Sequence, residues 1–510
     1  MLVEDKIWIS KNDTEQYIEL KRMNRHGLIS GATGTGKTTT LRVLAESLSK
    51  AGVPVFAADI KGDLSGLAEP GHDTPNMIER RERFKVNEKG FTYQGFPVTF
   101  WDVFGEKGHP VRATISEMGP ILLSNILNLT PAQEGILNIA FRLADENGLL
   151  LLDLADLKAM LQYIGDHASE ATLVYGNVTK ASVGALLREI LALENEGGDK
   201  FFGETSLDLE DWFRNDESGK GYINILECEQ LFQKPRLYAT FMLWMLSMLY
   251  DLLPEVGDLD KPKMVFFFDE AHLLFNKAPE SLIDKINQIV RLIRSKGVGV
   301  FFITQSPIDL PDSVLAQLGN RIQHGMHAYT PNEIKKVKAA SDTFRANPAF
   351  KTDEAILNLG IGEALVSFID EKGVPSMVEK TFILPPESNM EALSPFIIKQ
   401  ISANDSLAMK YDTVINRESA AEMLAAKYQE EARAKQEEAE SLIAAKEAEA
   451  QARQEALIAQ KEQAKREKEE ERQRRARERQ IESFTRSVTN TFGREITKKA
   501  TRTLFGILKK

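Results

Sequence analysis

Apolar runs of strand length alternate with helical repeats in the first part of the chain. Residues 27–30 and 54–58 are short apolar runs, and between them residues 38–50 repeat their apolar positions at helical spacing. A further run covers residues 96–104, and two small strands fit the first 25 residues. Strands that alternate with helices are typical of a parallel α/β sheet. We therefore predict an α/β fold with a central, mainly parallel sheet.

The pattern changes near residue 116 and returns near residue 264. Between these points Leu, Ala and Met recur at helical spacing, which predicts a mostly helical insertion. The runs 264–268 and 298–303 again have strand length, and residues 320–384 fit short strands around a helix. The predicted regions are a first core part at 1–110, the helical insertion at 111–260, a second core part at 261–385 and a linker at 386–415.

The C-terminal part has a different composition. Residues 416–482 consist largely of Ala, Glu, Lys, Arg and Gln without Gly or Pro, which predicts a long charged helix. Its apolar positions hold no strong heptad, so a lone helix and a weak coiled coil both fit. Residues 483–510 predict a basic amphipathic helix, with an apolar residue at every fourth position: Phe484, Val488, Phe492, Ile496, Ala500 and Leu504.

Charge and cysteine content indicate which partners and which cellular compartment fit the chain. The 510 residues carry a net charge of −11. Residues 461–510 contain 16 Lys and Arg and 8 Glu, a net of +8, which leaves −19 for the rest. An acidic body with a basic tail indicates that any contact with a polyanion is local. The single cysteine, Cys228, excludes an internal disulfide, and no apolar leader or membrane-length run is present, so we expect a cytoplasmic protein.

A glycine-rich loop follows the first core strand. Residues 31–38 match G-x-x-x-x-G-K-[ST] at every position, with a strand before and a helix after. Such a loop turns its N–H groups toward the β-phosphate of ATP, places Lys37 between the β- and γ-phosphates, and lets Thr38 bind Mg²⁺. The residues expected to hold the nucleotide are Gly31, Ala32, Thr33, Gly34, Thr35, Gly36, Lys37, Thr38 and Thr39.

Polar residues end three further core strands, where parallel strands meet a ligand. Asp269 and Glu270 follow the run 264–268, so we expect Asp269 to hold Mg²⁺ and Glu270 to act as general base. Gln305 follows the run 298–303 and is placed to sense the γ-phosphate or to position water. Asp59 follows the run 54–58, and its partner is left open between water, Mg²⁺ and its own loop.

Phosphoryl transfer commonly uses an arginine that stabilises the developing charge. The chemistry alone offers three candidates: Arg291 and Arg294, in the helix after Glu270, and Arg321, after Gly319-Asn320. Arginine is also common on the surfaces of helices, where it has no catalytic role. The sequence therefore predicts an ATPase with ATP and Mg²⁺ as ligands, and leaves the identity of the arginine open.

The motifs resemble those of bacterial HerA-like ATPases in the HerA/FtsK superfamily. The resemblance rests on residues 25–41, 59–67 and 269–272, together with Phe492-Gly493-Arg494 and Leu504-Phe505-Gly506. It implies a RecA-like core, a homo-oligomer that is usually a hexameric ring, and ATP-driven movement of double-stranded DNA. Within it, Arg294 is the best match to a basic segment before the sensor strand, and Arg321 the best candidate for an arginine supplied in trans.

One feature departs from the resemblance. HerA carries an N-terminal β-barrel before its ATPase core, whereas only about 25 residues precede the P-loop strand here. Two functions therefore compete. The first is a ring-forming DNA translocase or helicase-like motor. The second is an ATP-driven switch or remodeller that acts on a protein or membrane partner, engaged through the C-terminal helices.

Overall fold

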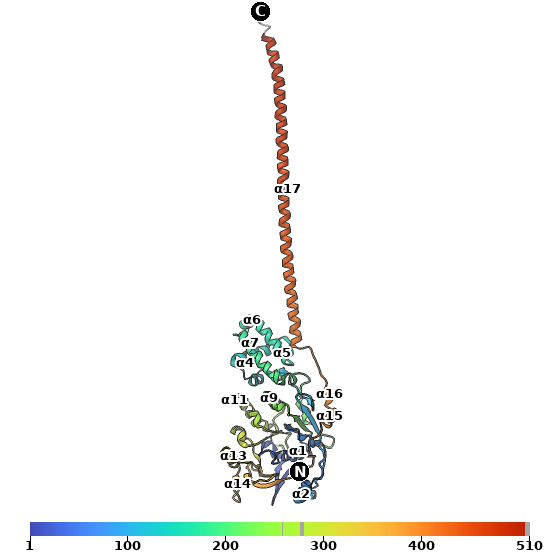
Figure 1. Cartoon of the computed structure of the whole chain (residues 1–510), viewed down its shortest axis with the longest axis vertical. Helices are drawn as coiled ribbons and strands as arrows, with labels where there is room; N and C mark the ends of the chain where they lie inside the picture. Colours follow the sequence, from blue (N-terminus) through green and yellow to red (C-terminus); the bar gives the residue numbers. More distant parts are fainter. Residues whose placement is uncertain (258, 276–279, 505–510) are drawn as a thin grey trace, which may run out of the picture. The chain divides into compact units, whose positions relative to one another are not determined.

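The computed structural model describes the backbone of residues 1–257, 259–275 and 280–504, and the side chains of these residues except 280–282 and 489–504. The chain divides into two compact units, Met1–Leu424 and Ala425–Lys510. The first unit holds the sheet and most of the helices, and the described part of the second unit belongs to one long helix (Figure 1).

The first unit is built on a 13-stranded sheet. Strands β11 to β7 in the spatial order run parallel, and β12, β13, β2 and β1 extend the sheet with antiparallel pairs. The order is β1 (Leu2–Val3), β2 (Lys6–Lys11), β13 (Glu379–Ile383), β12 (Glu363–Ser367), β11 (Asn320–His324), β4 (Gly27–Ser30), β10 (Val298–Thr304), β9 (Met264–Phe268), β5 (Val55–Asp59), β8 (Ile223–Glu227), β6 (Val98–Asp102) and β7 (His109–Pro110), with β3 (Glu15–Glu19) on β2. The predicted α/β class with a mainly parallel central sheet is confirmed.

Helices cover both faces of the sheet. Successive residues of β9 alternate between two hydrophobic clusters, with Phe266 in one and Phe267 in the other. Helix α1 (Lys37–Lys50) packs into the cluster of Phe267, and helices α9 (Pro235–Leu252) and α11 (Glu280–Ile293) pack into the cluster of Phe266. A parallel sheet is stable only when both faces are covered in this way.

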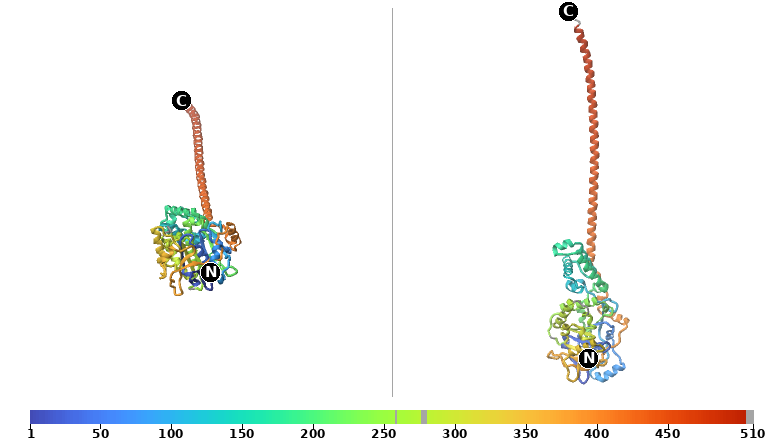
Figure 2. Two further views of the ribbon diagram at one scale, coloured as in Figure 1. Left: turned by 60° about the horizontal axis from the view of Figure 1, so that its bottom comes forward. Right: turned by 60° about the vertical axis from the view of Figure 1, so that its left-hand side comes forward.

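The remaining helices belong to the same unit, and those of residues 131–193 gather at one end of it (Figure 2). They are α2 (Pro75–Phe84), α3 (Ile115–Leu127), α4 (Pro131–Asn147), α5 (Leu154–Asp166), α6 (Ala168–Tyr175), α7 (Lys180–Leu193), α8 (Asp199–Phe201), α10 (His272–Phe275), α12 (Asp312–Leu315), α13 (Pro331–Asp342), α14 (Thr352–Leu357), α15 (Pro395–Asn404) and α16 (Ala408–Tyr411).

The region 111–260, predicted as a helical insertion, contains a central strand as well. Helices α3 to α7 fit the prediction, and capping boxes, such as Thr114 with Glu117, begin α3, α4 and α5. Strand β8, however, lies between β5 and β6 in the core sheet. Its apolar run is short and is broken by Asn224, whose amide binds backbone oxygens of Val55 and Trp212. A buried, fully bonded Asn hides a strand from a search for apolar periodicity.

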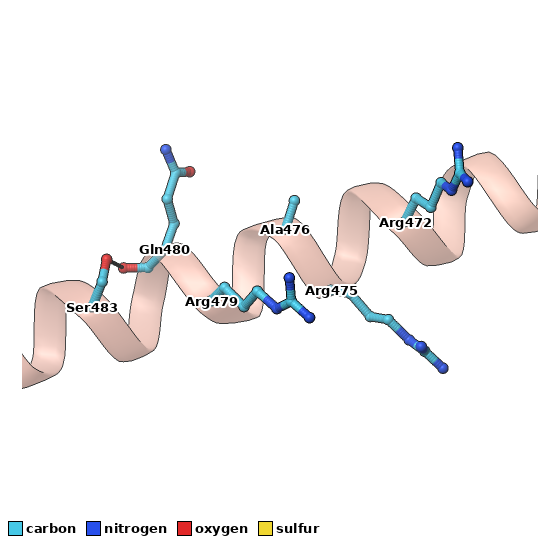
Figure 3. Close-up of a pocket in the computed structure, with 6 residues that line it drawn as sticks. All are labelled: Arg472, Arg475, Ala476, Arg479, Gln480 and Ser483. Atoms are coloured by element: carbon cyan, nitrogen blue, oxygen red, sulfur yellow. Dashed lines mark hydrogen bonds between the residues drawn. The ribbon is translucent and has the colours of Figure 1, made fainter.

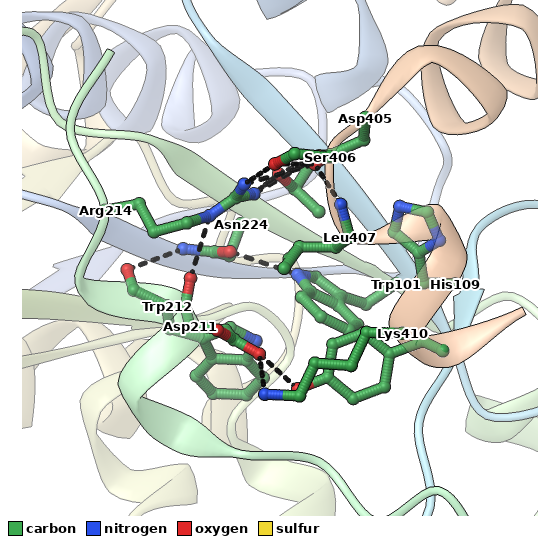
Figure 4. A network of polar contacts seen from close by, with 12 residues as sticks. Trp101, His109, Asp211, Trp212, Arg214, Asn224, Asp405, Ser406, Leu407 and Lys410 are labelled. Atoms are coloured by element: carbon green, nitrogen blue, oxygen red, sulfur yellow. Dashed lines mark hydrogen bonds and ion pairs between the residues drawn. The ribbon is translucent and has the colours of Figure 1, made fainter.

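The segment 386–415, predicted as a linker, is packed against the first unit. Arg214 binds both carboxylate oxygens of Asp405 at 3.1 and 3.2 Å. Tyr411 is fully buried and its hydroxyl contacts Asp211, which Figure 4 shows bound by Lys410 as well. Thr99, on β6, also binds Asp405 at 2.7 Å. These contacts make α15 and α16 part of the ATPase unit, because the polar groups of Asp405 and Tyr411 are satisfied by residues that are distant in the sequence.

Helix α17 (Ala420–Leu504) is 85 residues long. From residue 432 to residue 488 every side chain is exposed. Pairs one turn apart support it, such as Arg433 with Glu437 at 3.1 Å and Arg475 with Glu471 at 2.8 Å. The predicted basic amphipathic pattern at 483–510 lies largely outside the described side chains. In the part of the chain that is described, no helix is both long enough and apolar enough to cross a membrane.

Candidate nucleotide site

The carboxyl ends of four parallel strands place the predicted residues at one edge of the sheet. Strand β4 lies beside β10, which lies beside β9, which lies beside β5. The P-loop follows β4, Gln305 follows β10, and Asp269 with Glu270 follows β9. Asp59 ends β5. Residues far apart in the sequence therefore meet where an α/β sheet binds its ligand.

The P-loop backbone requires glycine. Gly31 has φ +149°, and a Cβ there would lie 2.6 Å from the Cβ of His324. Gly36 has φ +116° directly before helix α1. A side chain at either position would be strained by backbone conformation, and at Gly31 it would also collide with β11. The match to the P-loop pattern therefore has a physical cause in this chain.

The loop presents unpaired donors. The N–H groups of Gly31, Ala32 and Thr40 bind backbone oxygens of Thr304, Gly325 and Gly36. Among the described hydrogen bonds, none engages the N–H groups of residues 33–39, which include the first turn of α1. A row of free N–H groups at a helix start favours an anion. These residues fit the phosphates of a nucleotide.

Lys37 is buried at 5% exposure and lies inside the loop. Its Nζ donates to the backbone oxygens of Gly31 at 2.6 Å and Ala32 at 3.1 Å. Burial lowers its pKa, and the charges of Glu270 and Asp269 act in the opposite direction. Carbonyl oxygens therefore hold the ammonium where a phosphate would also be in reach.

Thr38 and Asp269 fit a magnesium ion. The structure gives the Thr38 hydroxyl no partner among the described residues, and the Asp269 carboxylate accepts only the N–H of Glu270, at 2.9 Å. Burial and the neighbouring Glu270 raise the pKa of Asp269 to about 6. A hydroxyl and a carboxylate with free oxygens are ligands that Mg²⁺ prefers.

Glu270 lies at the centre of a polar group on β9 and β10. It is 7% exposed, has φ +45°, and accepts a weak contact from Gln305 Nε2 at 3.5 Å. Lys61 Nζ lies 3.8 Å from one of its oxygens and His272 Nδ1 3.4 Å from the other. A cavity of about 410 Å³ adjoins Gln305 and His272. The carboxylate is thus held by its neighbours, and two of these, His272 and Gln305, line a space in which a water molecule fits.

Asp59 is bound to its own loop. Its Oδ1 accepts the N–H groups of Lys61 at 3.2 Å and Gly62 at 2.9 Å, and its Oδ2 accepts that of Leu64 at 2.8 Å. Burial and the charge of Asp63 raise its pKa to about 7. Of the three partners that the sequence left open, the structure shows the loop. The same contacts hold Lys61 beside Glu270.

Neither Arg294 nor Arg321 reaches the site within one chain. Arg294 precedes β10, whose seven residues span about 20 Å, so it lies at the opposite edge of the sheet. Arg321 is at the amino end of β11, and its guanidinium donates to backbone oxygens of Leu318, Thr343 and Leu315, each at 3.2 Å. Arg321 therefore joins elements of the fold, and its role as an arginine finger supplied in trans stays a prediction. Arg291 also precedes β10 and lies on α11.

The structure adds a residue that the sequence did not indicate. His324 ends β11 and lies buried under the P-loop, where burial lowers its pKa to about 4. Its Nδ1 donates to the backbone oxygen of Glu363 at 3.0 Å, so its Nε2 accepts the Thr40 hydroxyl at 2.8 Å. Only the register between β11 and β4 reveals this support, because 284 residues separate His324 from Thr40.

Comparison with known proteins places the chain in a family. A family model described as helicase HerA-like C-terminal matches residues 4–510. The DNA double-strand break repair helicase HerA of Saccharolobus solfataricus is 23% identical over 364 residues, which are 70% of this chain and 64% of that protein. The chain thus spans less than two thirds of that relative's length.

Solved structures with a similar arrangement are distant in sequence. The unbound bacterial conjugative coupling protein TrwBΔN70 is 16% identical, with a TM-score of 0.48 over 76% of this chain and 92% of that chain. VirB4 of Thermoanaerobacter pseudethanolicus is 15% identical, with a TM-score of 0.48 over 75% and 96%. Because the family model covers nearly the whole chain, we conclude that the protein is a P-loop ATPase of the helicase HerA-like C-terminal family.

Proposed function

We propose that the protein hydrolyses ATP with Mg²⁺ and uses the energy to move double-stranded DNA. The observation that carries the hydrolysis part is the buried Glu270 carboxylate beside Gln305, at the same sheet edge as the free N–H groups of the P-loop. A carboxylate at that place is suited to take a proton from an attacking water. Family membership favours a motor over a regulatory nucleotide switch.

Each residue has a role in this proposal. Lys37 and the N–H groups of residues 33–39 hold the phosphates, with Thr39 at the edge of this cradle. Thr38 and Asp269 hold Mg²⁺, which would neutralise part of the phosphate charge when bound. Gln305 orients the water that Glu270 deprotonates. Asp59 acts through its loop and positions Lys61, whose ammonium lies 3.8 Å from Glu270.

We further propose that several copies assemble, with a ring of six as the arrangement that the HerA resemblance implies. The described part of one chain supplies no arginine close to Glu270, so a neighbouring copy is the expected source. Arg294 is the better candidate for that role, because the guanidinium of Arg321 is already bound to three carbonyl groups. A ring also accounts for local contact with DNA despite the acidic body.

The rate of ATP hydrolysis with and without duplex DNA tests this function, together with the mass in solution under each condition. We expect duplex DNA to raise the rate several-fold at about 50 mM salt, and we expect ATP to favour the larger assembly. Hydrolysis that responds to no form of DNA or RNA would contradict DNA movement while leaving the ATPase intact. If the unmodified protein hydrolyses no ATP in any assembly state, both the ATPase activity and the DNA movement are contradicted.

The alternative is an ATP-driven switch that acts on a protein or a membrane. It is favoured by the net charge of −19 outside the last 50 residues, which repels nucleic acid from most of the surface. In that case ATP hydrolysis would be indifferent to DNA. It would instead change with anionic vesicles or with a protein that is captured only in the presence of ATP.

A further inference from the structure

Helix α17 carries a one-sided line of positive charge. Between residues 461 and 486, seven Lys and Arg side chains lie within about 40° of a single line along the helix, at 100° of rotation per residue. This line is about 37 Å long at 1.5 Å per residue. We call it the basic stripe, and it consists of Lys461, Lys465, Lys468, Arg472, Arg475, Arg479 and Arg486.

The negative charges of the same segment lie elsewhere. Each glutamate between residues 461 and 486 is about 60° or more away from the line, and the nearest is Glu482. Three other arginines, Arg466, Arg474 and Arg477, lie on the far side among glutamates. The helix is therefore positively charged on one side and carries both positive and negative side chains on the other. Its composition alone does not show this division.

The ion pairs follow this division in part, because Arg475 of the stripe is paired with Glu471 at 2.8 Å. Arg474, on the mixed side, is paired with Glu478 at 3.4 Å. In the described part of α17, Lys461, Lys465, Lys468, Arg472 and Arg479 have no carboxylate within ion-pair distance. All side chains of the stripe are exposed. Figure 3 shows Arg472, Arg475 and Arg479 on successive turns of the helix, together with Ala476, Gln480 and Ser483.

The position of the apolar residues decides between two kinds of anionic partner. Ile481 and Phe484 are 65% and 72% exposed, and Val488 is 40% exposed. At 100° per residue all three lie on the side opposite the stripe. A helix on an anionic membrane buries an apolar side that is flanked by basic residues. Here the apolar side chains and the basic stripe lie on opposite sides of the helix, so both cannot contact one membrane surface at the same time. A stripe that is positive and free of apolar residues fits the row of phosphate groups along a nucleic-acid backbone.

We propose that the basic stripe binds the phosphate backbone of nucleic acid without sequence preference. This goes beyond the proposed motor function, because it places a second contact outside the ATPase unit Met1–Leu424. Guanidinium groups bind phosphates in pairs of hydrogen bonds, and successive turns of the stripe present such groups about 5 Å apart. The binding energy comes from counterion release, so the affinity falls steeply as salt increases.

The test compares two triple variants of the full-length protein. One changes Arg472, Arg475 and Arg479 to Gln, and the other changes Arg466, Arg474 and Arg477 to Gln. Both remove three positive charges from the same helix, and Gln preserves helix propensity. The readout is the fluorescence anisotropy of labelled duplex DNA and of labelled single-stranded DNA, without ATP, at several salt concentrations. Circular dichroism checks that both variants remain equally helical.

We expect the stripe variant to bind duplex DNA at least tenfold more weakly than the unchanged protein at about 100 mM salt. Its salt slope should fall by about 2.7, which corresponds to three lost phosphate contacts. The control variant should change less than twofold. Equal losses in both variants, or no loss in either, would overturn the stripe as a site.

A second measurement separates the alternatives. Flotation with vesicles of phosphatidylcholine containing about 30% phosphatidylserine should be the same for both variants. A stripe variant that loses vesicle binding but keeps its DNA affinity would overturn the proposal in favour of a membrane partner. DNA that fails to stimulate hydrolysis, while the anisotropy result holds, would reject DNA movement and leave the stripe in place.

Discussion

At the scale of single residues, the nucleotide site contains two kinds of side chain. Some are fixed by hydrogen bonds to the backbone, and others are held by neighbouring side chains. Lys37 is fixed by two carbonyl oxygens, and Asp59 by three N–H groups. Glu270 is instead surrounded by side chains of three different loops or helices, those of Lys61, His272 and Gln305. Its neighbours can therefore change position more readily than the phosphate cradle can.

Changing Glu270 to Gln should separate binding from hydrolysis. Gln keeps the size of the side chain but removes the base, so we expect hydrolysis to fall by about 10²–10⁴-fold while ATP still binds. Phosphate release and the binding of a fluorescent ATP analogue measure the two properties. Lys37→Ala should lose both, and Glu391→Gln, on an exposed loop, should lose neither. Hydrolysis at the normal rate in Glu270→Gln would contradict the role of general base.

Glu227 should make stability depend on pH. It ends β8 between Asp59 and Asp102, is 4% exposed, and neither of its oxygens has a hydrogen-bond partner. Burial and the charge of Asp59 raise its pKa from 4.5 to about 8. The folded state therefore holds a proton that the unfolded state has lost, and stability should fall as pH rises from about 4.5 to about 8.

The variant Glu227→Gln removes this dependence. We expect it to be more stable than the unchanged protein by about 1–2 kcal/mol at pH 7, because Glu227 ionises and lowers the free energy of the unfolded state at this pH, whereas Gln does not. The difference should vanish near pH 4.5. Chemical denaturation at several pH values measures it. Glu229→Gln, close by and exposed, is the matched control. An equal change in both variants would contradict the role of burial.

At the scale of elements, β11 supports the P-loop from behind. His324 contacts Thr40, and Gly325 accepts the N–H of Ala32 at 2.8 Å. Gly362, before β12, donates to Thr35 at 3.0 Å. The strands that follow the sensor strand along the chain therefore lie on the other side of β4, where they position the phosphate cradle. Mutations in β11 should affect nucleotide binding although none of its residues matches a nucleotide motif.

Arg321 tests the distinction between a structural and a catalytic arginine. Arg321→Ala leaves three backbone oxygens without their partner, so we expect a loss of stability of about 1–3 kcal/mol. The hydrolysis rate per folded molecule should change less than threefold. An arginine finger would instead cost 10³–10⁵ in rate with little change in stability. Thermal unfolding and steady-state hydrolysis, measured on the same preparation, separate the two outcomes, with Arg294→Ala as the comparison.

At the scale of the whole molecule, the charged helix and the ATPase unit are separate bodies. The segment 386–415 belongs to the ATPase unit, since Asp405 and Tyr411 are fixed by Arg214 and Asp211. The first turn of α17 also belongs to it, where Ala421 donates to Asp156 at 2.8 Å. The boundary between the units therefore falls inside the helix, after Leu424.

A chain that ends at Leu424 should fold and hydrolyse ATP. We expect its melting temperature to lie within about 3 °C of the full-length value, because residues 432–488 bury no side chain. Its hydrolysis rate without DNA should stay within about twofold. A second chain that ends at residue 404 removes Asp405 and Tyr411 from the ATPase unit and should be clearly less stable. Aggregation of the chain that ends at Leu424 would contradict the division into two units.

The sequence by itself determined the parts of the site that are contiguous or that end a strand. The P-loop, Asp269 with Glu270, and Gln305 each follow an apolar run, and parallel strands bring such ends together whatever the order of the strands. The long helix was equally predictable, because helix propensity over many residues needs no tertiary contact. These features depend on residues that are close together in the sequence, so the sequence alone is enough to predict them.

Only the tertiary structure decided what depends on register and on distant partners. It placed β8 in the core although Asn224 interrupts its apolar run, and it put His324 under the P-loop. It also bound Arg321 to three carbonyls and placed Arg294 at the far edge of the sheet. A polar side chain looks the same in sequence whether it meets a ligand, a backbone oxygen or water. Which of these it meets is fixed by strands hundreds of residues away.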